Sequence, residues 1–163
     1  MEHVEHPFPP VLSPDSRILI LGSFPSVRSR EEGFFYGHPR NRFWSVLADI
    51  FDEPIPASIP EKESLILRHH LALWDVIASC RIEGSSDASV RDAVPVDIDR
   101  ITRTCSIRRV ICNGALAGKL YHQHLEAALG LEPLILPSTS PANAAWHLDR
   151  LCEAWRAALT LEV

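Results

Sequence analysis

The sequence predicts an α/β fold, a three-layer α/β/α sandwich built around a central, mainly parallel sheet of four strands. Four short apolar runs lack the alternation of half-buried strands, which is typical of strands covered on both faces. Segments with apolar residues at helical spacing lie between these runs, and this order indicates right-handed crossovers and a layered fold. The chain has 163 residues, 46% of them hydrophobic, which is enough for one domain with a full core.

The four predicted strands are short and apolar. The first covers residues 17–21, where four aliphatic residues in a row are followed by Gly22 and Pro25, which close the strand. The other three are predicted at residues 71–76, 108–112 and 133–136.

Helical spacing predicts five helices, at residues 42–51, 61–70, 96–104, 114–129 and 144–159. Asn41 and Asn143 are placed to cap the first and the last of them, and Gly130 is placed to end the fourth. Residues 84–95 are predicted to form a polar loop on the ligand side of the sheet. We expect residues 1–16 to be an extended N-terminal arm that docks on a single domain formed by residues 17–163.

Composition excludes several classes of protein. No apolar run approaches the roughly 20 residues that cross a bilayer, and the acidic N-terminus is unlike a secretory signal, so we expect a cytoplasmic protein without a membrane partner. The four cysteines include no C-x-x-C pair, so we expect no zinc or iron–sulfur centre. The net charge of −5 argues against a nucleic-acid partner, but four arginines cluster locally and allow a basic rim, namely Arg28, Arg30, Arg40 and Arg42.

Polar motifs follow all four predicted strands. They are GSFPS at residues 22–26, WD at 74–75, NG at 113–114 and LPSTSPAN at 136–143. Because the carboxyl ends of parallel strands meet at one edge of a sheet, we expect these motifs to converge. Four polar strand ends together predict a crevice for a polar ligand.

These motifs, with GFFYGHPRNRFW at residues 33–44, resemble the uracil-DNA glycosylase superfamily and, within it, the hypoxanthine-DNA glycosylase (DNA-deoxyinosine glycosylase) family. The resemblance implies base excision repair without metal or cofactor. A deaminated base is flipped out of double- or single-stranded DNA, and its N-glycosidic bond is hydrolysed. Hypoxanthine is the expected base. The alternatives are uracil, mainly opposite guanine, and a non-catalytic nucleotide-binding module.

The resemblance assigns catalysis to Asn41, in the segment HPRN. Related mismatch-specific enzymes carry an Asn two residues after the leading glycine of the first motif, where this chain has Phe24. An amide has no useful pKa, but its carbonyl oxygen can orient a water molecule while positive charge builds on the sugar. The alternative is that Asn41 only caps its helix.

The base pocket is expected to contain residues from several motifs. The resemblance assigns base stacking to Tyr36, with Phe24 as a second apolar wall. Asp75 is placed to accept the N1–H of hypoxanthine, and its alternative role is to hold the 85–87 loop. His38 is placed either to supply positive charge or to tie its own loop together. Strand-end groups complete the expected base-binding set, which is Gly22, Ser23, Phe24, Tyr36, His38, Asp75 and Asn113.

Contacts with the DNA backbone are expected from arginines and from one loop. The expected residues are Arg40, Arg42, Ser138, Thr139, Ser140, Pro141, Ala142 and Asn143. Pro141 and Ala142 occupy the position of a minor-groove wedge in relatives, and because both are small we expect weak intercalation. For Asn143 the alternative is helix capping.

The sequence argues against two other reactions, a lyase reaction and a serine-hydrolase reaction. A lyase reaction needs a nucleophilic amine, and both lysines, Lys62 and Lys119, fall on predicted helices away from the strand ends, so we expect a monofunctional enzyme. A serine hydrolase would need a G-x-S-x-G elbow, which the sequence lacks. We expect the protein to be a monomer, associated with the nucleoid when it acts on DNA.

Overall fold

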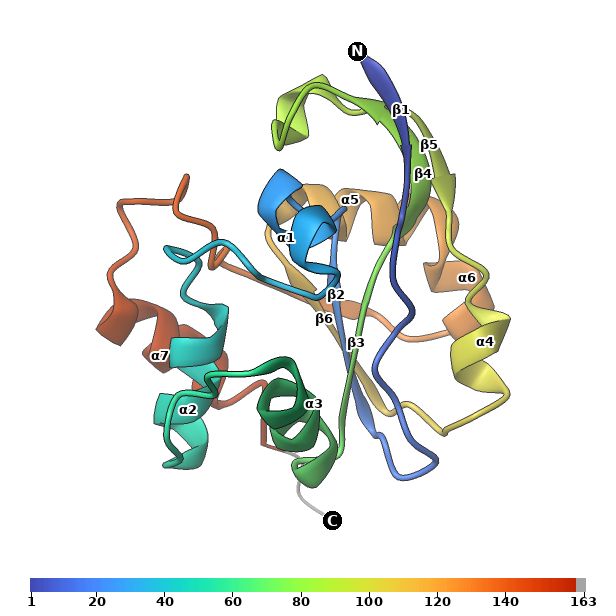
Figure 1. Cartoon of the computed structure of the whole chain (residues 1–163). Helices are drawn as coiled ribbons and strands as arrows, with labels where there is room; N and C mark the ends of the chain where they lie inside the picture. The colour runs from blue at the N-terminus through green and yellow to red at the C-terminus, as the bar shows by residue number, and fades with distance from the viewer. Residues whose placement is uncertain (161–163) are drawn as a thin grey trace.

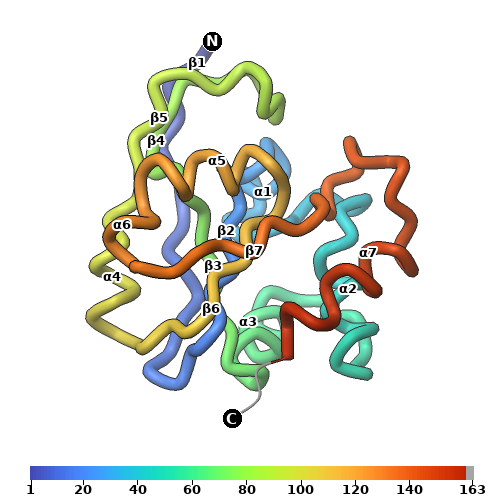
Figure 2. The backbone as a smooth tube through the Cα atoms, turned by 180° about the vertical axis from the view of Figure 1, so that it is seen from behind, coloured from blue at the N-terminus to red at the C-terminus, as the bar shows by residue number. Residues whose placement is uncertain are grey.

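The computed structural model describes residues 1–160, so the last three residues of the predicted domain lie outside it. A four-stranded parallel sheet lies at the centre, in the order β3–β2–β6–β7. Its strands are β2 (Ile18–Gly22), β3 (Leu71–Asp75), β6 (Arg109–Asn113) and β7 (Pro133–Leu136). Helices lie on both sides of this sheet (Figure 1), as the view from behind also shows (Figure 2). The predicted fold class is therefore confirmed.

The core explains why these strands could be recognised. All five residues of β2 and all five residues of β3 are buried, and so are the three central residues of β6. A strand that is covered on both faces has no solvent side and needs no polar residues. The strand β7 differs: it lies at one edge of the sheet and exposes Leu134 and Ile135, whereas β3, at the other edge, is buried.

The helices divide between the two faces of the sheet. On one side lie α2 (Phe43–Phe51), α3 (Ile59–Arg68) and α7 (Leu148–Arg156), with α2 packed against α7. On the other side lie α4 (Asp99–Thr102), α5 (Ala115–His124) and α6 (Glu126–Leu129).

Two predicted helices need correction. Residues 114–129 form two helices, because the backbone of Leu125 (φ −121°, ψ −23°) interrupts the helix. The last helix begins at Leu148, after an irregular segment, and His147 stands at its N-cap. Asn143 therefore does not cap it.

A short helix, α1 (Val27–Glu32), was not predicted. It begins where the Ser26 hydroxyl accepts a hydrogen bond from the Ser29 N–H at 3.2 Å, and it ends at Gly33, whose φ is 77°. Six mostly polar residues carry too little periodicity to be recognised.

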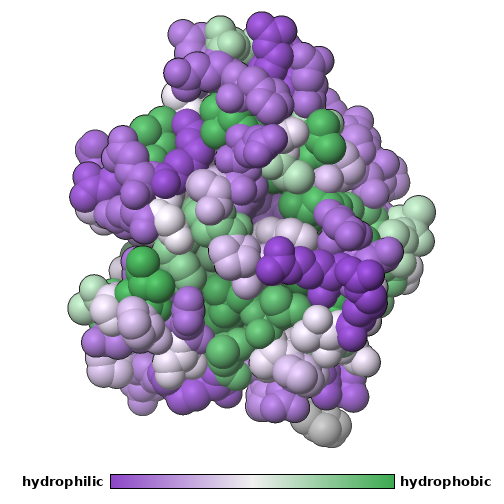
Figure 3. Space-filling model, turned by 45° about the vertical axis from the view of Figure 1, so that its right-hand side comes forward, coloured by the Kyte–Doolittle hydropathy of each residue, from purple (hydrophilic) through white to green (hydrophobic). Residues whose placement is uncertain are grey.

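A second, antiparallel sheet of three strands was also missed. Its order is β1–β4–β5, formed by β1 (Glu2–Glu5), β4 (Ile77–Ile82) and β5 (Arg91–Pro95). The predicted loop at residues 84–95 therefore contains β5 and a 3-10 helix, η1 (Asp87–Ser89). This end of the molecule is covered largely by hydrophilic residues (Figure 3), because its strands expose many charged side chains.

The N-terminal arm is integrated into the fold by these pairings. The strand β1 pairs with β4, and further along the arm Val11 exchanges two backbone hydrogen bonds with Leu73, of 3.0 and 2.9 Å. The arm is therefore attached to both sheets, and the residues between these two anchors are held in place.

The structure also bears on membranes and metals. Within residues 1–160, no helix is long and apolar enough to cross a membrane. In the same part of the chain, no group of three or more His, Cys, Asp or Glu side chains is arranged to hold a metal ion. All four cysteines are buried free thiols, and burial raises the pKa of Cys112 to about 12.

Candidate functional site

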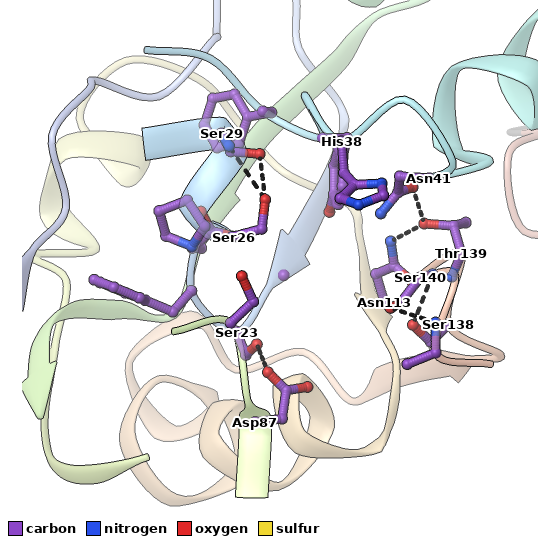
Figure 4. Close-up of a pocket in the computed structure, with 18 of the residues that line it drawn as sticks. Ser23, Ser26, Ser29, His38, Asn41, Asp87, Asn113, Ser138, Thr139 and Ser140 are labelled. Atoms are coloured by element: carbon purple, nitrogen blue, oxygen red, sulfur yellow. Dashed lines mark hydrogen bonds between the residues drawn. The ribbon is translucent and has the colours of Figure 1, made fainter. Parts of the chain in front are cut away.

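A cavity of about 510 Å³ opens at the carboxyl ends of the parallel strands (Figure 4). The strand register brings Gly22 beside Asp75 and Asn113 beside Leu136. The predicted convergence of the strand-end motifs is thus confirmed. The residues lining the cavity are Gly22, Ser23, Phe24, Pro25, Ser26, Ser29, Phe35, Tyr36, His38, Asn41, Asp75, Ser85, Ser86, Asp87, Asn113, Ser138, Thr139, Ser140, Pro141 and Ala142.

One wall of the cavity is a hydrogen-bond network centred on the buried side chain of Thr139. Its hydroxyl donates to Asn41 Oδ1 at 2.9 Å and accepts from Asn113 Nδ2 at 3.0 Å. The Thr139 N–H donates to Asn113 Oδ1 at 3.1 Å. Both amide side chains are therefore fixed in orientation by the same residue, as Figure 4 shows.

The carbonyl oxygen of Asn41 is fully used within the protein. Besides the Thr139 hydroxyl, it accepts the N–H of Phe43, the first residue of α2, at 2.9 Å. An amide oxygen has two acceptor positions, so neither remains for water. The N-cap position of α2 is occupied by Arg42, so the predicted capping role of Asn41 is wrong, although its oxygen does accept the first N–H of the helix. Water orientation through this oxygen does not fit the arrangement. The Asn41 amide nitrogen lies on the pocket side (Figure 4).

Tyr36 is held in an unusual conformation at the cavity. Its φ is +53°, in the left-handed region, and one face of its ring stacks on Phe43 with 4.0 Å between centroids. The hydroxyl is buried and has no hydrogen-bond partner within residues 1–160. Burial raises the pKa of Tyr36 far above its ordinary value; Asp75 raises it further, while the nearby Asn113 amide lowers it. The ring therefore offers only its second face for stacking.

Asp75 lies at the floor of the cavity and is nearly fully buried. Its Oδ2 pairs with Nε2 of His6 from the N-terminal arm at 2.7 Å. Its Oδ1 lies against Gly22, where an added methyl group would overlap it and would stand 3.2 Å from the Tyr36 hydroxyl. No hydrogen bond from the described residues reaches Oδ1, which remains a free acceptor.

The 85–87 loop is held by residues other than Asp75. The Ser23 hydroxyl donates to Asp87 at 3.3 Å, and the backbone N–H of Val27 donates to the Ser85 hydroxyl at 2.9 Å. The alternative role of Asp75 in holding this loop is therefore wrong. Partial burial raises the pKa of Asp87, and the negative charge of Asp75 acts in the same direction.

Two more predicted base-binding residues line the same cavity. The Nδ1 atom of His38 accepts the backbone N–H of Arg40 at 3.1 Å, so this side of the ring ties the loop together and Nε2 remains for the cavity. Phe24 is buried to 9% exposure, with the guanidinium of Arg30 above its ring at 5.6 Å. The loop-tying role of His38 is thus seen in the structure, whereas a positively charged imidazolium, which carries a hydrogen on both nitrogens, could not accept this hydrogen bond at Nδ1.

The two arginines expected to bind DNA have different surroundings. The guanidinium of Arg42 donates to the carbonyls of Ser140 (2.8 Å), Asn143 (3.2 Å) and Trp146, so it holds the loop that follows β7. Arg40 is exposed, and its side chain forms no hydrogen bond with residues 1–160. Of the two, Arg40 is the one available to a phosphate.

The loop at residues 137–147 carries the remaining predicted DNA contacts. Ser138, Thr139, Ser140, Pro141 and Ala142 line the cavity, whereas Asn143 lies in a neighbouring depression and donates through Nδ2 to the Ser138 carbonyl at 3.0 Å. The side chain of Asn143 therefore stabilises the loop.

Several cavity residues were not anticipated. The only sequence signal for Ser85, Ser86 and Asp87 was that their polar loop follows the second predicted strand, on the ligand side of the sheet. His6 lies outside the cavity lining and binds Asp75. Its role could not be predicted from the sequence, because the N-terminal arm carries no recognisable motif. Lys62 and Lys119 are both absent from the cavity lining.

Comparison with known proteins gives consistent results. Residues 9–160 match the family described as the uracil DNA glycosylase superfamily. A hypoxanthine DNA glycosylase of Methanosarcina acetivorans is 35% identical over 156 residues, which cover 94% of this chain and 97% of the relative. One from Methanosarcina barkeri is 32% identical over 83% of this chain and 86% of its own length. An NMR structure of a candidate uracil DNA glycosylase from M. acetivorans superposes with a TM-score of 0.80 at 32% identity, covering 93% of this chain and 94% of that one.

Proposed function

The chain belongs to the uracil DNA glycosylase superfamily and is a DNA glycosylase for deaminated bases, and we propose that hypoxanthine in DNA is its principal substrate. In this proposal the enzyme hydrolyses the N-glycosidic bond of deoxyinosine and leaves an abasic site. The curated relatives from Methanosarcina support this choice, because both carry the name hypoxanthine DNA glycosylase.

The free oxygen of Asp75 at the cavity floor is the observation that supports the substrate best. Deamination of adenine converts the acceptor N1 into an N1–H donor, and a carboxylate oxygen can only accept hydrogen bonds. The Asp75 Oδ1 therefore favours hypoxanthine and repels the N1 lone pair of adenine. In this way the enzyme recognises the chemical change made by deamination itself.

The flipped base is held by aromatic side chains. A base inside the duplex stack is out of reach, so it is extruded into the cavity at a cost of about a few kcal/mol. The face of Tyr36 that is not packed on Phe43 stacks on the base, and Phe24 forms the second apolar wall. Asn113, Ser23 and His38 line the same space and complete the base-binding set.

Catalysis is assigned to Asn41 acting through its amide nitrogen. As the bond between the sugar C1′ and the base nitrogen breaks, positive charge builds on the sugar and negative charge on the base. A fixed N–H donor beside the departing base stabilises that negative charge. Water then adds to C1′, with its proton released to solvent, and neither of the two lysines lines the cavity to form a Schiff base.

The DNA is held by the loop at residues 138–142 and by Arg40. The hydroxyls and backbone of this loop border the cavity, and Arg40 is an exposed cation next in sequence to Asn41, which lines the cavity. We expect the enzyme to act as a monomer on double- or single-stranded DNA, in the cytoplasm at the nucleoid.

The test uses end-labelled duplexes that each contain one hypoxanthine, uracil or xanthine. They are incubated with excess enzyme and EDTA, and half of each sample is then treated with alkali. We expect cleavage at hypoxanthine that requires alkali. Cleavage without alkali would contradict the monofunctional mechanism, and no release of any base would contradict the assignment as a whole.

Uracil is the second candidate substrate. Its N3–H is likewise created by deamination, so the same Asp75 oxygen can accept it, and the structural neighbour is described as a candidate uracil DNA glycosylase. Faster release of uracil from G:U pairs than of hypoxanthine would establish it as the principal substrate.

A further inference from the structure

We propose that His6, in the N-terminal arm, is a positioning residue for base recognition. Its Nε2 lies 2.7 Å from Asp75 Oδ2, and both side chains are 5% exposed. The inference rests on the proposed function of Asp75 as the acceptor for the base. His6 touches neither the cavity nor a substrate, so it acts through Asp75 alone.

The direction of the His6–Asp75 hydrogen bond follows from the second ring nitrogen. The backbone N–H of Phe8 approaches His6 Nδ1 at 3.5 Å, so Nδ1 is the acceptor and Nε2 carries the hydrogen. The ring thus donates to Asp75. Since one hydrogen bond places Oδ2, and the carboxylate is planar, the direction of Oδ1 is fixed as well.

The surroundings hold the imidazole ring in place. The His6 backbone N–H donates to the Ala78 carbonyl at 2.8 Å, and three aromatic rings surround the side chain. Their centroids lie 4.5 Å (Phe8), 6.1 Å (Phe24) and 6.0 Å (Phe35) from that of His6. A ring packed in this way has little freedom to turn away from its partner.

The consequence concerns the free rotation of a carboxylate. The terminal torsion of Asp is broad, so an unsupported carboxylate samples many orientations. In this structure Oδ1 occupies the space above Gly22 while His6 holds Oδ2. His6, in the N-terminal arm, therefore determines the direction in which Asp75 Oδ1 points at the floor of the cavity.

Two substitutions separate the hydrogen bond from the packing. His6→Phe keeps an aromatic ring among Phe8, Phe24 and Phe35 but has no N–H donor. His6→Gln places an amide N–H at a similar distance from the backbone. The measurement is the burst of hypoxanthine release with substrate in excess over enzyme, whose rate constant reports base release and whose amplitude reports the fraction of active enzyme. Folding defects lower the amplitude, whereas a misplaced acceptor lowers the rate constant.

We expect His6→Phe to lower the rate constant about tenfold to a hundredfold, the range for a lost hydrogen bond to a charged group, and His6→Gln to recover most of the loss. In an Asp75→Asn background, His6→Phe should add little further loss, because His6 acts only through Asp75. Binding to a duplex that contains a tetrahydrofuran abasic-site analogue should be unchanged in all variants, since that ligand has no base.

Two results would overturn the inference. One is a lower amplitude with an unchanged rate constant in His6→Phe, which would assign His6 a purely structural role. The other is a loss of rate constant from His6→Phe that is as large in the Asp75→Asn background as in the wild type. Failure of the proposed function is distinguishable from both, because wild-type enzyme would then release uracil faster than hypoxanthine, or no deaminated base at all.

Discussion

Asn41 and Thr139 are 98 residues apart in the sequence and are joined by a hydrogen bond of 2.9 Å between their side chains. The bond connects the segment before α2 with the loop after β7, and it settles which end of the Asn41 amide faces the cavity. The orientation of Asn41, the residue assigned to catalysis, thus depends on the hydroxyl of Thr139, which lies in a different motif far along the chain.

Asn41→Ala removes the amide donor assigned to the departing base. We expect the single-turnover rate of hypoxanthine release to fall about 10²- to 10³-fold, the usual loss for a fixed donor at developing negative charge. Affinity for the tetrahydrofuran duplex should change little. Gel-shift titration and burst kinetics measure the two quantities, and near-normal turnover would refute the catalytic role.

Thr139→Val keeps the volume of the side chain but removes the hydroxyl. Asn41 and Asn113 then each lose a hydrogen bond in a buried setting, so we expect a loss of about 1–3 kcal/mol in the free energy of unfolding. The rate of base release should fall about tenfold because the Asn41 amide is less well oriented. Thr139→Ser, which retains the hydroxyl, is the matched control, and urea denaturation reports the stability of both. Equal behaviour of the two variants would contradict this account.

Gly22→Ala introduces a methyl group where Asp75 Oδ1 lies. The carboxylate has to move, and a displacement of about 1 Å at a reacting site costs up to about a hundredfold in rate. We expect base release to slow by about that amount while binding to the tetrahydrofuran duplex persists. A fully active variant would show that the Asp75 acceptor is not required at its present position.

Arg42 and Arg40 are predicted to differ in a salt titration. Arg40→Ala should lower the slope of log affinity against log salt by about one, as expected for one lost phosphate contact. Arg42→Lys keeps the charge but cannot serve three carbonyls, so it should behave like Arg42→Ala, with faster hydrogen exchange in residues 139–146. If Arg42→Lys instead resembled the wild type, a phosphate contact would be the better explanation.

Acid sensitivity is expected from Glu53, whose carboxylate pairs with His69 and Arg68. These hydrogen bonds hold the pKa of Glu53 below its ordinary value of 4.5. Because the folded pKa is lower than the unfolded one, the stabilising contribution is complete above the ordinary value and disappears as the pH falls through the folded pKa. The difference in urea midpoint between wild type and Glu53→Gln should therefore be present at neutral pH and disappear as the pH falls through the lowered pKa of Glu53. Glu63→Gln, at an exposed position, should show no such trend.

The parallel sheet and the location of the cavity could be predicted because they depend on local pattern. Buried strands such as β2 have no polar face, and parallel strands bring residues such as Gly22, Asp75 and Asn113 to a common edge. The antiparallel sheet was hidden for the opposite reason. A strand such as Arg91–Pro95 has no buried residue and combines two charged residues with a proline, so its composition is that of a loop.

The details of the site could not be predicted because they depend on distant partners. Asn41 was recognised, but its oxygen is occupied by Thr139 and by the backbone of its own helix. Asp75 was placed at the base, but its partner His6 lies 69 residues away in an arm without a motif. Local sequence reports residue types and approximate positions, whereas the direction of a donor or acceptor is set by contacts made only in the folded chain.

The open edge of the parallel sheet has a consequence for solubility. An exposed edge strand with apolar residues such as Leu134 and Ile135 is a template on which a second chain can add and begin aggregation. In this protein the strand is only four residues long, begins with Pro133 and is followed directly by Pro137, and neither proline has an N–H to donate. Since alternate residues face outward, at most two N–H groups are offered along that edge. The two prolines therefore protect this edge of the sheet against polymerisation.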